Sequence, residues 1–119
     1  MTSPSTKIDF EKITNRPIAV ITNGYDVEDV SKTLLDEKFT LAHIGSFLSE
    51  RNPRILWKAL KELVKEEPGF ASDFRLKLIG KISQDVLDSI AEFKLSKYVD
   101  NLGYVSHQEA IMHQRKSQV

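Results

Sequence analysis

The chain contains no cysteine among its 119 residues, and this excludes disulfide bonds and thiolate metal sites. A reducing compartment is compatible with that absence, so we expect a cytoplasmic protein. No apolar run approaches the roughly 18 residues that a membrane-spanning helix needs. Residues 1–7 also lack the apolar stretch of a secretory signal. The sequence therefore predicts neither a transmembrane segment nor a signal peptide.

An excess of charge of either sign is also missing. Seventeen Lys and Arg residues balance seventeen Asp and Glu residues, for a formal net charge of zero. Proteins that hold nucleic acid by neutralising phosphates usually carry a basic excess, so we expect no nucleic-acid partner. With 40% hydrophobic and 29% charged residues, the composition is that of a globular protein, and the length suits one ordinary domain.

Several sequence signatures of known chemistry are absent as well. The chain has no G-x-x-x-x-G-K-[ST] and no G-x-G-x-x-G, so neither a mononucleotide P-loop nor a standard dinucleotide fingerprint is present. G-x-S-x-G is missing, which removes the usual α/β-hydrolase nucleophile. No pair of histidines or carboxylates has the spacing of a metal site. We therefore predict no bound cofactor and no metal.

The N-terminal part of the sequence gives weak structural signals. The first dozen residues are polar and include Pro4, which indicates a tail or linker. Residues 18–21 (Ile-Ala-Val-Ile) form a mostly β-branched apolar run that predicts a buried strand. Asn23-Gly24 is a strong turn signal because both residues tolerate positive φ. Residues 26–35 show a weak helical spacing of apolar side chains.

From residue 39 onward the pattern becomes regular. Apolar runs ending at glycine predict strands, and capped segments with one apolar face predict helices. The expected strands are 39–44, 75–79 and 98–102, with a fourth beginning at Ser117, and the expected helices are 53–65, 84–93 and 107–113. This alternation suits right-handed crossovers in a parallel sheet. The sequence thus predicts an α/β, Rossmann-like parallel sheet with flanking helices.

The expected helices have recognisable ends. Asn52 is predicted as the cap of the first, with Pro53 at its first helical position and Pro68-Gly69 ending it. Ser83 is predicted to cap the second. Ser106 and Glu109 have the spacing of a capping box at the start of the third. On the first helix we expect a core-facing set of apolar residues, namely Ile55, Leu56, Ala59, Leu60, Leu63 and Val64.

Three expected strands end at Gly45, Gly80 and Gly103. In an open parallel sheet, ligands bind beyond the carboxyl ends of the strands, and glycine lets a phosphate approach the backbone. Tight strand-to-helix turns explain the same glycines, and spacing alone leaves both interpretations open. Arg51 could pair with a diphosphate, although by itself it is more typical of a solvated loop residue. His43, within an apolar strand, is more typical of a core histidine than of a base.

Taken in order, the motifs resemble one enzyme family. Val20-Ile-Thr-Asn-Gly-Tyr-Asp26 is similar to the segment that closes the N-terminal domain of retaining GT-B glycosyltransferases. Phe39-Thr-Leu-Ala-His-Ile-Gly45, followed by Arg51-Asn-Pro53 and the helix after it, resembles the first strand and phosphate loop of their C-terminal domain. Leu76-Lys-Leu-Ile-Gly80 and Val99-Asp-Asn-Leu-Gly-Tyr-Val-Ser-His107 resemble the next two strand-and-loop units. The resemblance covers about residues 17–119.

The resemblance implies a particular organisation. Residues 1–36 would be a tail and interdomain segment that includes the last strand of the N-terminal domain. Residues 37–119 would be an incomplete C-terminal half of a GT-B fold, the half that binds the nucleotide sugar. The implied enzyme transfers a sugar from a UDP- or GDP-sugar to an acceptor, as in glycan or polysaccharide biosynthesis.

The resemblance also implies roles for individual residues. Gly45 and Arg51 would face the diphosphate, Gly80 would border the cleft, and Tyr104 and Val105 would lie beside the base. No catalytic residue is assigned within this chain. Enzymes of this kind need no metal, because positive side chains and a helix end stabilise the departing diphosphate.

The sequence departs from the family at two places. Ser46 and Asn52-Pro53 stand where many members have a basic residue and a Lys-Gly, so Arg51 is the only cation in the loop. The family's E-x7-E segment and most of its N-terminal acceptor domain would lie outside residues 1–119. We therefore expect a partial donor site without turnover of its own.

Two alternatives remain open at this stage. One is a non-catalytic α/β interaction module, although a receiver-like version lacks the acidic strand ends it would need. The other is a GT-B-type sugar-nucleotide epimerase. In each case, exposed segments at residues 18–21 and 118–119 would leave apolar surface or sheet edge uncovered, and such surfaces favour self-association.

Overall fold

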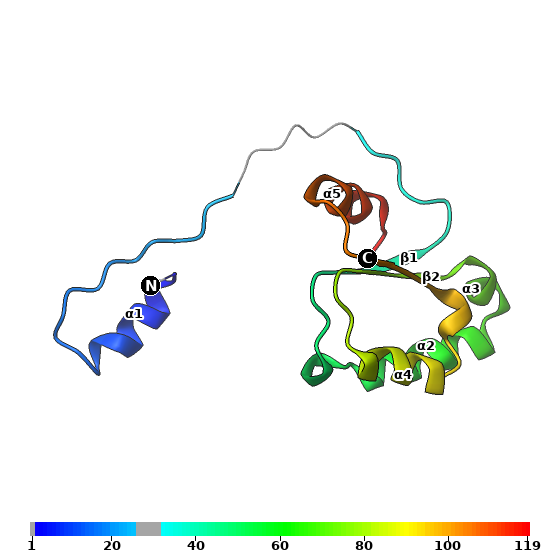
Figure 1. The fold of residues 1–119 in the computed structure, drawn as a ribbon, viewed down its shortest axis with the longest axis horizontal. Coiled ribbons are helices and arrows are strands. Elements are labelled where there is room, and N and C mark those ends of the chain that lie inside the picture. The colour runs from blue at the N-terminus through cyan, green and yellow to red at the C-terminus, as the bar shows by residue number, and fades with distance from the viewer. Residues whose placement is uncertain (1, 26–31) are drawn as a thin grey trace. The chain divides into compact units, whose positions relative to one another are not determined.

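The computed structural model describes residues 2–25 and 32–119, and its contacts divide the chain into two units, residues 1–31 and 32–119. The predicted boundary after residue 36 therefore falls inside the second unit. Figure 1 shows the course of the chain and the labels of its helices and strands.

Among its described residues, 2–25, the first unit contains one helix, α1 (Pro4–Glu11), where we expected a tail. The Ser3 hydroxyl accepts a hydrogen bond from the Thr6 N–H, and Pro4 occupies the first helical turn, the pattern of a capped helix start. The predicted strand at residues 18–21 is wrong, since no strand is assigned there. An apolar run becomes a strand only when a neighbouring strand forms a hydrogen-bond ladder with it.

The weak helix expected over residues 26–35 lies mostly outside the described residues, and 32–35 are not helical.

The second unit is the predicted α/β sheet. Its three strands are β1 (Thr40–Ile44), β2 (Arg75–Ile79) and β3 (Val99–Gly103). They pair in parallel in the order β1-β2-β3, with Thr40 opposite Arg75 and Leu76 opposite Val99. The Rossmann-like fold class is therefore confirmed.

No strand is assigned at residues 117–119, where the sequence predicted one to begin, but this C-terminal segment is hydrogen-bonded along β1. The Val119 N–H donates to the Thr40 carbonyl at 3.2 Å, and the Ala42 N–H donates to the Val119 carbonyl at 2.8 Å. This is the hydrogen-bond pattern of parallel pairing. The spatial order is thus C-terminal segment, β1, β2, β3, so the direction of strand addition reverses at β1.

Helices cover the two faces of the sheet unequally. Helices α2 (Arg54–Glu66), α3 (Pro68–Asp73) and α4 (Gln84–Glu92) lie on one face, and α5 (His107–Lys116) lies on the other (Figure 1). Right-handed crossovers explain this division, because the chain moves from β1 to β3 in one direction and returns past β1 in the other. Two 3₁₀ turns, Ser49–Arg51 and Ser96–Tyr98, complete the unit.

The core lies between the sheet and helices α2 and α4. Leu78 and Val86 are fully buried at its centre, and Phe74 packs against Phe70 with ring centroids 4.8 Å apart. The other buried members of this cluster are Phe47, Trp57, Leu60, Leu76, Ile90, Leu95 and Tyr98. The predicted core face of α2 is thus right in part: Leu60 is buried and Val64 is half-buried against the core, whereas Ile55, Leu56, Ala59 and Leu63 are exposed.

The helix ends follow the sequence rules in part. Ser106 and Glu109 form the predicted capping box. Ser83 stands at the cap position of α4, but its hydroxyl makes no capping bond. Pro68 does not simply end α2; it begins α3, where a proline at the first position loses no hydrogen bond.

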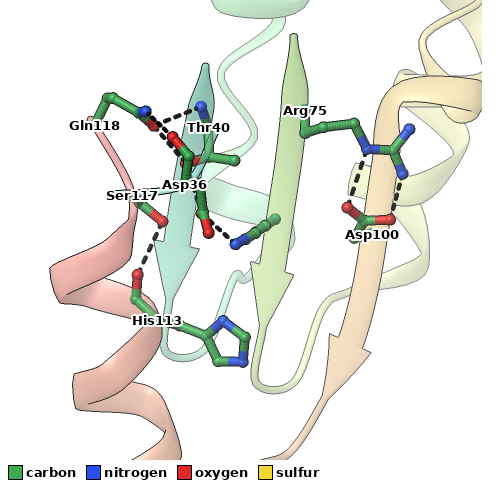
Figure 2. Close-up of polar contacts among 8 residues, drawn as sticks. Asp36, Thr40, Arg75, Asp100, His113, Ser117 and Gln118 are labelled. Atoms are coloured by element: carbon green, nitrogen blue, oxygen red, sulfur yellow. Dashed lines mark hydrogen bonds and ion pairs between the residues drawn. The ribbon is translucent and has the colours of Figure 1, made fainter. Parts of the chain in front are cut away.

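A polar cluster fastens the C-terminal segment to the sheet (Figure 2). The Thr40 hydroxyl and the Lys77 ammonium each donate to Oδ2 of Asp36, at 3.0 and 2.5 Å. The amide of Gln118 donates to the Asp36 carbonyl at 2.8 Å and accepts from the Thr40 N–H at 2.9 Å. Asp36 therefore joins β1, β2 and the C-terminal segment at the amino ends of the strands.

Asp36 gives a test of this cluster. Burial alone would raise the pKa of Asp36, but hydrogen bonds from Lys77 and Thr40 and the charges of Lys77 and Lys116 together lower it. A lowered folded-state pKa adds stability that is present above the unfolded value and is lost as pH falls through the folded value. We expect Asp36→Asn to lower the free energy of unfolding by about 1–2 kcal/mol near pH 7.

Urea unfolding measured between about pH 7 and about pH 2 checks this expectation. The difference between the parent and Asp36→Asn should begin to shrink as pH falls below about 4, where Asp36 of the unfolded chain becomes protonated, and should be smallest once the pH is also below the lowered folded-state pKa. Asp88→Asn on the exposed face of α4 is the control and should have little effect. A difference that stays constant down to pH 2 would contradict the role of the Asp36 charge.

Candidate functional site

Three glycines end the parallel strands, and each adopts a positive φ. The values are +129° for Gly45, +116° for Gly80 and +66° for Gly103. Side chains rarely tolerate this region, so glycine is needed for all three turns. The turns lie at the carboxyl edge of the sheet, where open α/β folds bind their ligands.

Gly80 has a second reason to be glycine. Its N–H donates to the Gly103 carbonyl at 2.7 Å, and the Gly45 N–H donates to the Ile79 carbonyl at 2.8 Å. A Cβ on residue 80 would lie 2.9 Å from the carbonyl carbon of Gly45 and closer still to its oxygen. Around Gly45 and Gly103, by contrast, nothing lies within 4 Å of an added Cβ. The space beside Gly45 and Gly103 is therefore open. At residue 80, by contrast, the lack of a side chain allows the turn after β2 to lie against the turn after β1.

The loop after β1 stays attached to the loop after β2. Phe47 donates its N–H to the Lys81 carbonyl at 2.9 Å and accepts from the Ser83 N–H at 2.9 Å. Phe47 and Ile82 form an isolated parallel bridge. The two loops therefore extend the β1–β2 pairing past the glycine turns. These bonds fix the position of Phe47, from which the β1 loop continues to α2.

Asn52 is not the cap of α2, as the sequence suggested; Pro53 holds the cap position. The Asn52 side chain instead turns toward the core. Its carbonyl oxygen accepts from Nε1 of Trp57 at 2.7 Å, and its amide donates to the Ser89 hydroxyl at 2.7 Å and the Asp85 carbonyl at 3.3 Å. A buried indole N–H needs an acceptor, and Asn52 supplies it.

Arg54 strengthens the same junction between α2 and α4. Its guanidinium donates to both carboxylate oxygens of Glu92, at 2.8 and 2.9 Å, and lies 5.2 Å above the ring of Phe93. The hydrogen bond from Arg54 lowers the pKa of Glu92. Arg54 is therefore engaged with a carboxylate and is not free to meet an anion.

The start of α2 offers fewer free donors to an anion than the sequence suggested. Pro53 has no N–H, and the N–H of Arg54 donates to the Asn52 carbonyl at 3.0 Å. The N–H groups of Leu56 and Trp57 both donate to the Pro53 carbonyl. An anion at this end would depend on nearby side chains more than on the helix end.

The other arginine near the start of α2 is Arg51, which, unlike Arg54, is not engaged with a carboxylate in the described residues. It lies in the 3₁₀ turn before α2, is exposed, and makes no ion pair within residues 2–25 and 32–119. It also borders a pocket of about 340 Å³ beside β1, whose walls include His43, Phe47, Leu56 and Trp57. Arg51 can therefore meet either an anion or a group held in this pocket.

His43 points into the protein, as the sequence indicated for a core histidine. Its ring packs on Phe47 with centroids 4.0 Å apart. Its Nε2 is buried and makes no hydrogen bond within the described part of the chain. Packing against Phe47 accounts for the position of the ring.

The two residues expected beside the base follow β3. Tyr104 is 93% exposed and Val105 is half-buried, and α5 begins directly after them. The structure thus brings Gly45, Gly80 and the end of β3 together at one edge. The binding roles of these residues and of Arg51 stay predictions.

In the described residues, no three His, Asp or Glu side chains gather in a way that could hold a metal ion. No described helix is long and apolar enough to cross a membrane. Comparison of the chain with protein-family models finds no matching family, and comparison with curated proteins finds no match.

Alanine at the glycine turns tests the geometry of this edge. We expect Gly80→Ala to lower the free energy of unfolding by more than about 3 kcal/mol, because the positive φ adds about 1–3 kcal/mol and the Cβ also collides with backbone. Gly45→Ala has a similar φ penalty but open space around the Cβ, so its cost should stay near about 1–3 kcal/mol and below that of Gly80→Ala. Urea unfolding of the two variants measures both costs. Equal losses of unfolding free energy would show that the close contact between Gly80 and Gly45 adds no penalty for a side chain at residue 80.

Proposed function

We propose that this chain carries the donor-binding region of a retaining GT-B glycosyltransferase, with a UDP- or GDP-sugar as its ligand. The observation that carries the proposal is the meeting of three positive-φ glycine turns at the carboxyl edge of a parallel sheet. The ordered sequence motifs add the family resemblance. The proposed enzyme class is a transferase, and binding is the activity to seek in this chain.

The strand order supports a particular location for the ligand. The C-terminal segment pairs with one edge of β1 while β2 pairs with the other. Ligands in open α/β sheets bind in the crevice where the strand order reverses. Here that point lies at the end of β1, which is the position of Gly45 and the loop leading to Arg51.

Electrostatics support the same edge. A diphosphate needs positive charge, and a guanidinium can bind two phosphate oxygens at once. Arg51 makes no ion pair within the described residues, whereas Arg54 is engaged with Glu92. We therefore assign the diphosphate to Arg51 and the open space beside Gly45. The absence of cysteine is consistent with a cytoplasmic enzyme acting on soluble sugar nucleotides.

An interaction module is the rival from another class, because glycine turns alone explain the sheet edge. A nucleotide titration followed by backbone amide shifts separates the two. We expect UDP or GDP to bind with an affinity on the order of millimolar, about 4 kcal/mol. The shifts should cluster at residues 45–53 and 103–107.

Arg51→Ala should weaken this binding several-fold, because it removes the charge proposed to face the diphosphate. Arg16→Ala, which removes an exposed arginine from the first unit, is the matched control and should leave the affinity unchanged. Unperturbed amide spectra without nucleotide would show that each variant is folded. Scattered shifts, or equal effects of the two variants, would favour the interaction module.

A further inference from the structure

Helix α2 exposes an apolar stripe that nothing in its own unit covers. Trp57 and Leu60 are its buried residues, and they turn one side of the helix into the core. The opposite positions were expected to be buried too, but Ile55 is 87% exposed, Leu63 42% and Leu56 38%. With the exposed Ala59, these make the apolar stripe: Ile55, Leu56, Ala59 and Leu63.

Helical geometry places these four residues on one side. At 3.6 residues per turn they fall within an arc of about 100°. The neighbouring helix α4 contacts α2 on another side, through Arg54 and through Lys61, whose ammonium lies 5.9 Å from the Phe93 ring. Helix α5 lies across the sheet (Figure 1). The apolar stripe is thus free for a partner from outside this unit.

We propose that the apolar stripe binds the same stripe of a second copy of this chain, with the two α2 helices antiparallel. Leu56 and Leu63 lie symmetrically about the midpoint between residues 59 and 60, so a twofold axis there places Leu56 of each copy against Leu63 of the other. A small residue at the crossing lets two helix backbones approach to about 8–10 Å. Antiparallel helices also bring opposite dipole ends together.

The charges beside the stripe fit this arrangement. Lys58 and Glu62 flank the apolar stripe on the same side, and neither forms an ion pair within residues 2–25 and 32–119. A twofold axis perpendicular to the helices brings each flank against the same flank of the other copy. Lys58 of one copy then faces Glu62 of its partner, twice, as flanking charges do in coiled coils.

The size of the stripe sets the expected strength. One helix face of 13 residues buries less than the roughly 1,200 Å² of a standard stable interface, so the contact should be weak. We expect a dissociation constant on the order of 100 µM. Leu56 also lines the pocket beside Arg51, so the dimer is tested without nucleotide, and that result does not depend on whether nucleotide binds.

Sedimentation of the full chain from about 10 µM to 1 mM tests the dimer. The parent should show a reversible monomer–dimer equilibrium, and Leu63→Glu should shift the midpoint at least tenfold higher. Leu102→Glu is the matched control, because Leu102 on β3 is also 42% exposed. It should leave the equilibrium unchanged. A parent that stays monomeric at 1 mM, or equal effects of the two variants, overturns the proposal.

Charge exchange distinguishes this contact from any other self-association. Lys58→Glu and Glu62→Lys should each weaken the dimer several-fold, because like charges then face each other across the axis. The double variant should restore the parent affinity. Failure of the double variant to restore it overturns the antiparallel arrangement. Loss of association in Ile21→Glu but not in Leu63→Glu assigns it instead to residues 18–21 and also overturns the proposal.

Discussion

The close approach of Gly80 to Gly45 is the constraint on which the carboxyl edge of this sheet depends. Because residue 80 has no Cβ, the carbonyl of Gly45 can occupy the space beside it, and the loops after β1 and β2 continue to pair as far as Phe47 and Ile82. That pairing fixes where the β1 loop begins, and the Asn52 side chain fixes where it meets α2 and α4. Arg51 is held between these two attachments. The position of the proposed anion ligand therefore follows from a backbone contact that tolerates no side chain.

Local signals were enough to predict the sheet, and long-range contacts decided what they missed. Strand runs that end in glycine and a capping box at Ser106 depend on neighbours in sequence, and the structure contains them. The predicted strand at residues 18–21 needed a partner strand, which sequence spacing cannot reveal. The helices beginning at Pro4 and Pro68 differ from the prediction because proline, which breaks a helix in its interior, also suits the first helical turn.

The rotation of α2 could not be predicted for a different reason. Apolar residues occupy more than half of its circumference, so periodicity allowed two faces to be the buried one. The structure buries Trp57, the largest side chain, whose N–H finds its acceptor in Asn52. Burial of that indole turns Ile55 and Leu63 outward. Burial of Trp57 therefore explains two departures from expectation. Asn52 bonds to the indole instead of capping α2, and the apolar stripe of α2 is exposed.

Charge pairing limits what the candidate site can do. Arg54, Arg75 and Lys77 each face a carboxylate of the same unit, whereas Arg51, in the loop after β1, forms no ion pair within the described residues. An exposed ion pair contributes only about 0–1 kcal/mol, and the start of α2 has already used several of its N–H groups. Neither source gives strong binding by itself. The location of a bound nucleotide is therefore more informative about this chain than its affinity. Even weak binding at the point where the strand order reverses distinguishes a donor-binding sheet from a sheet whose glycines only make turns.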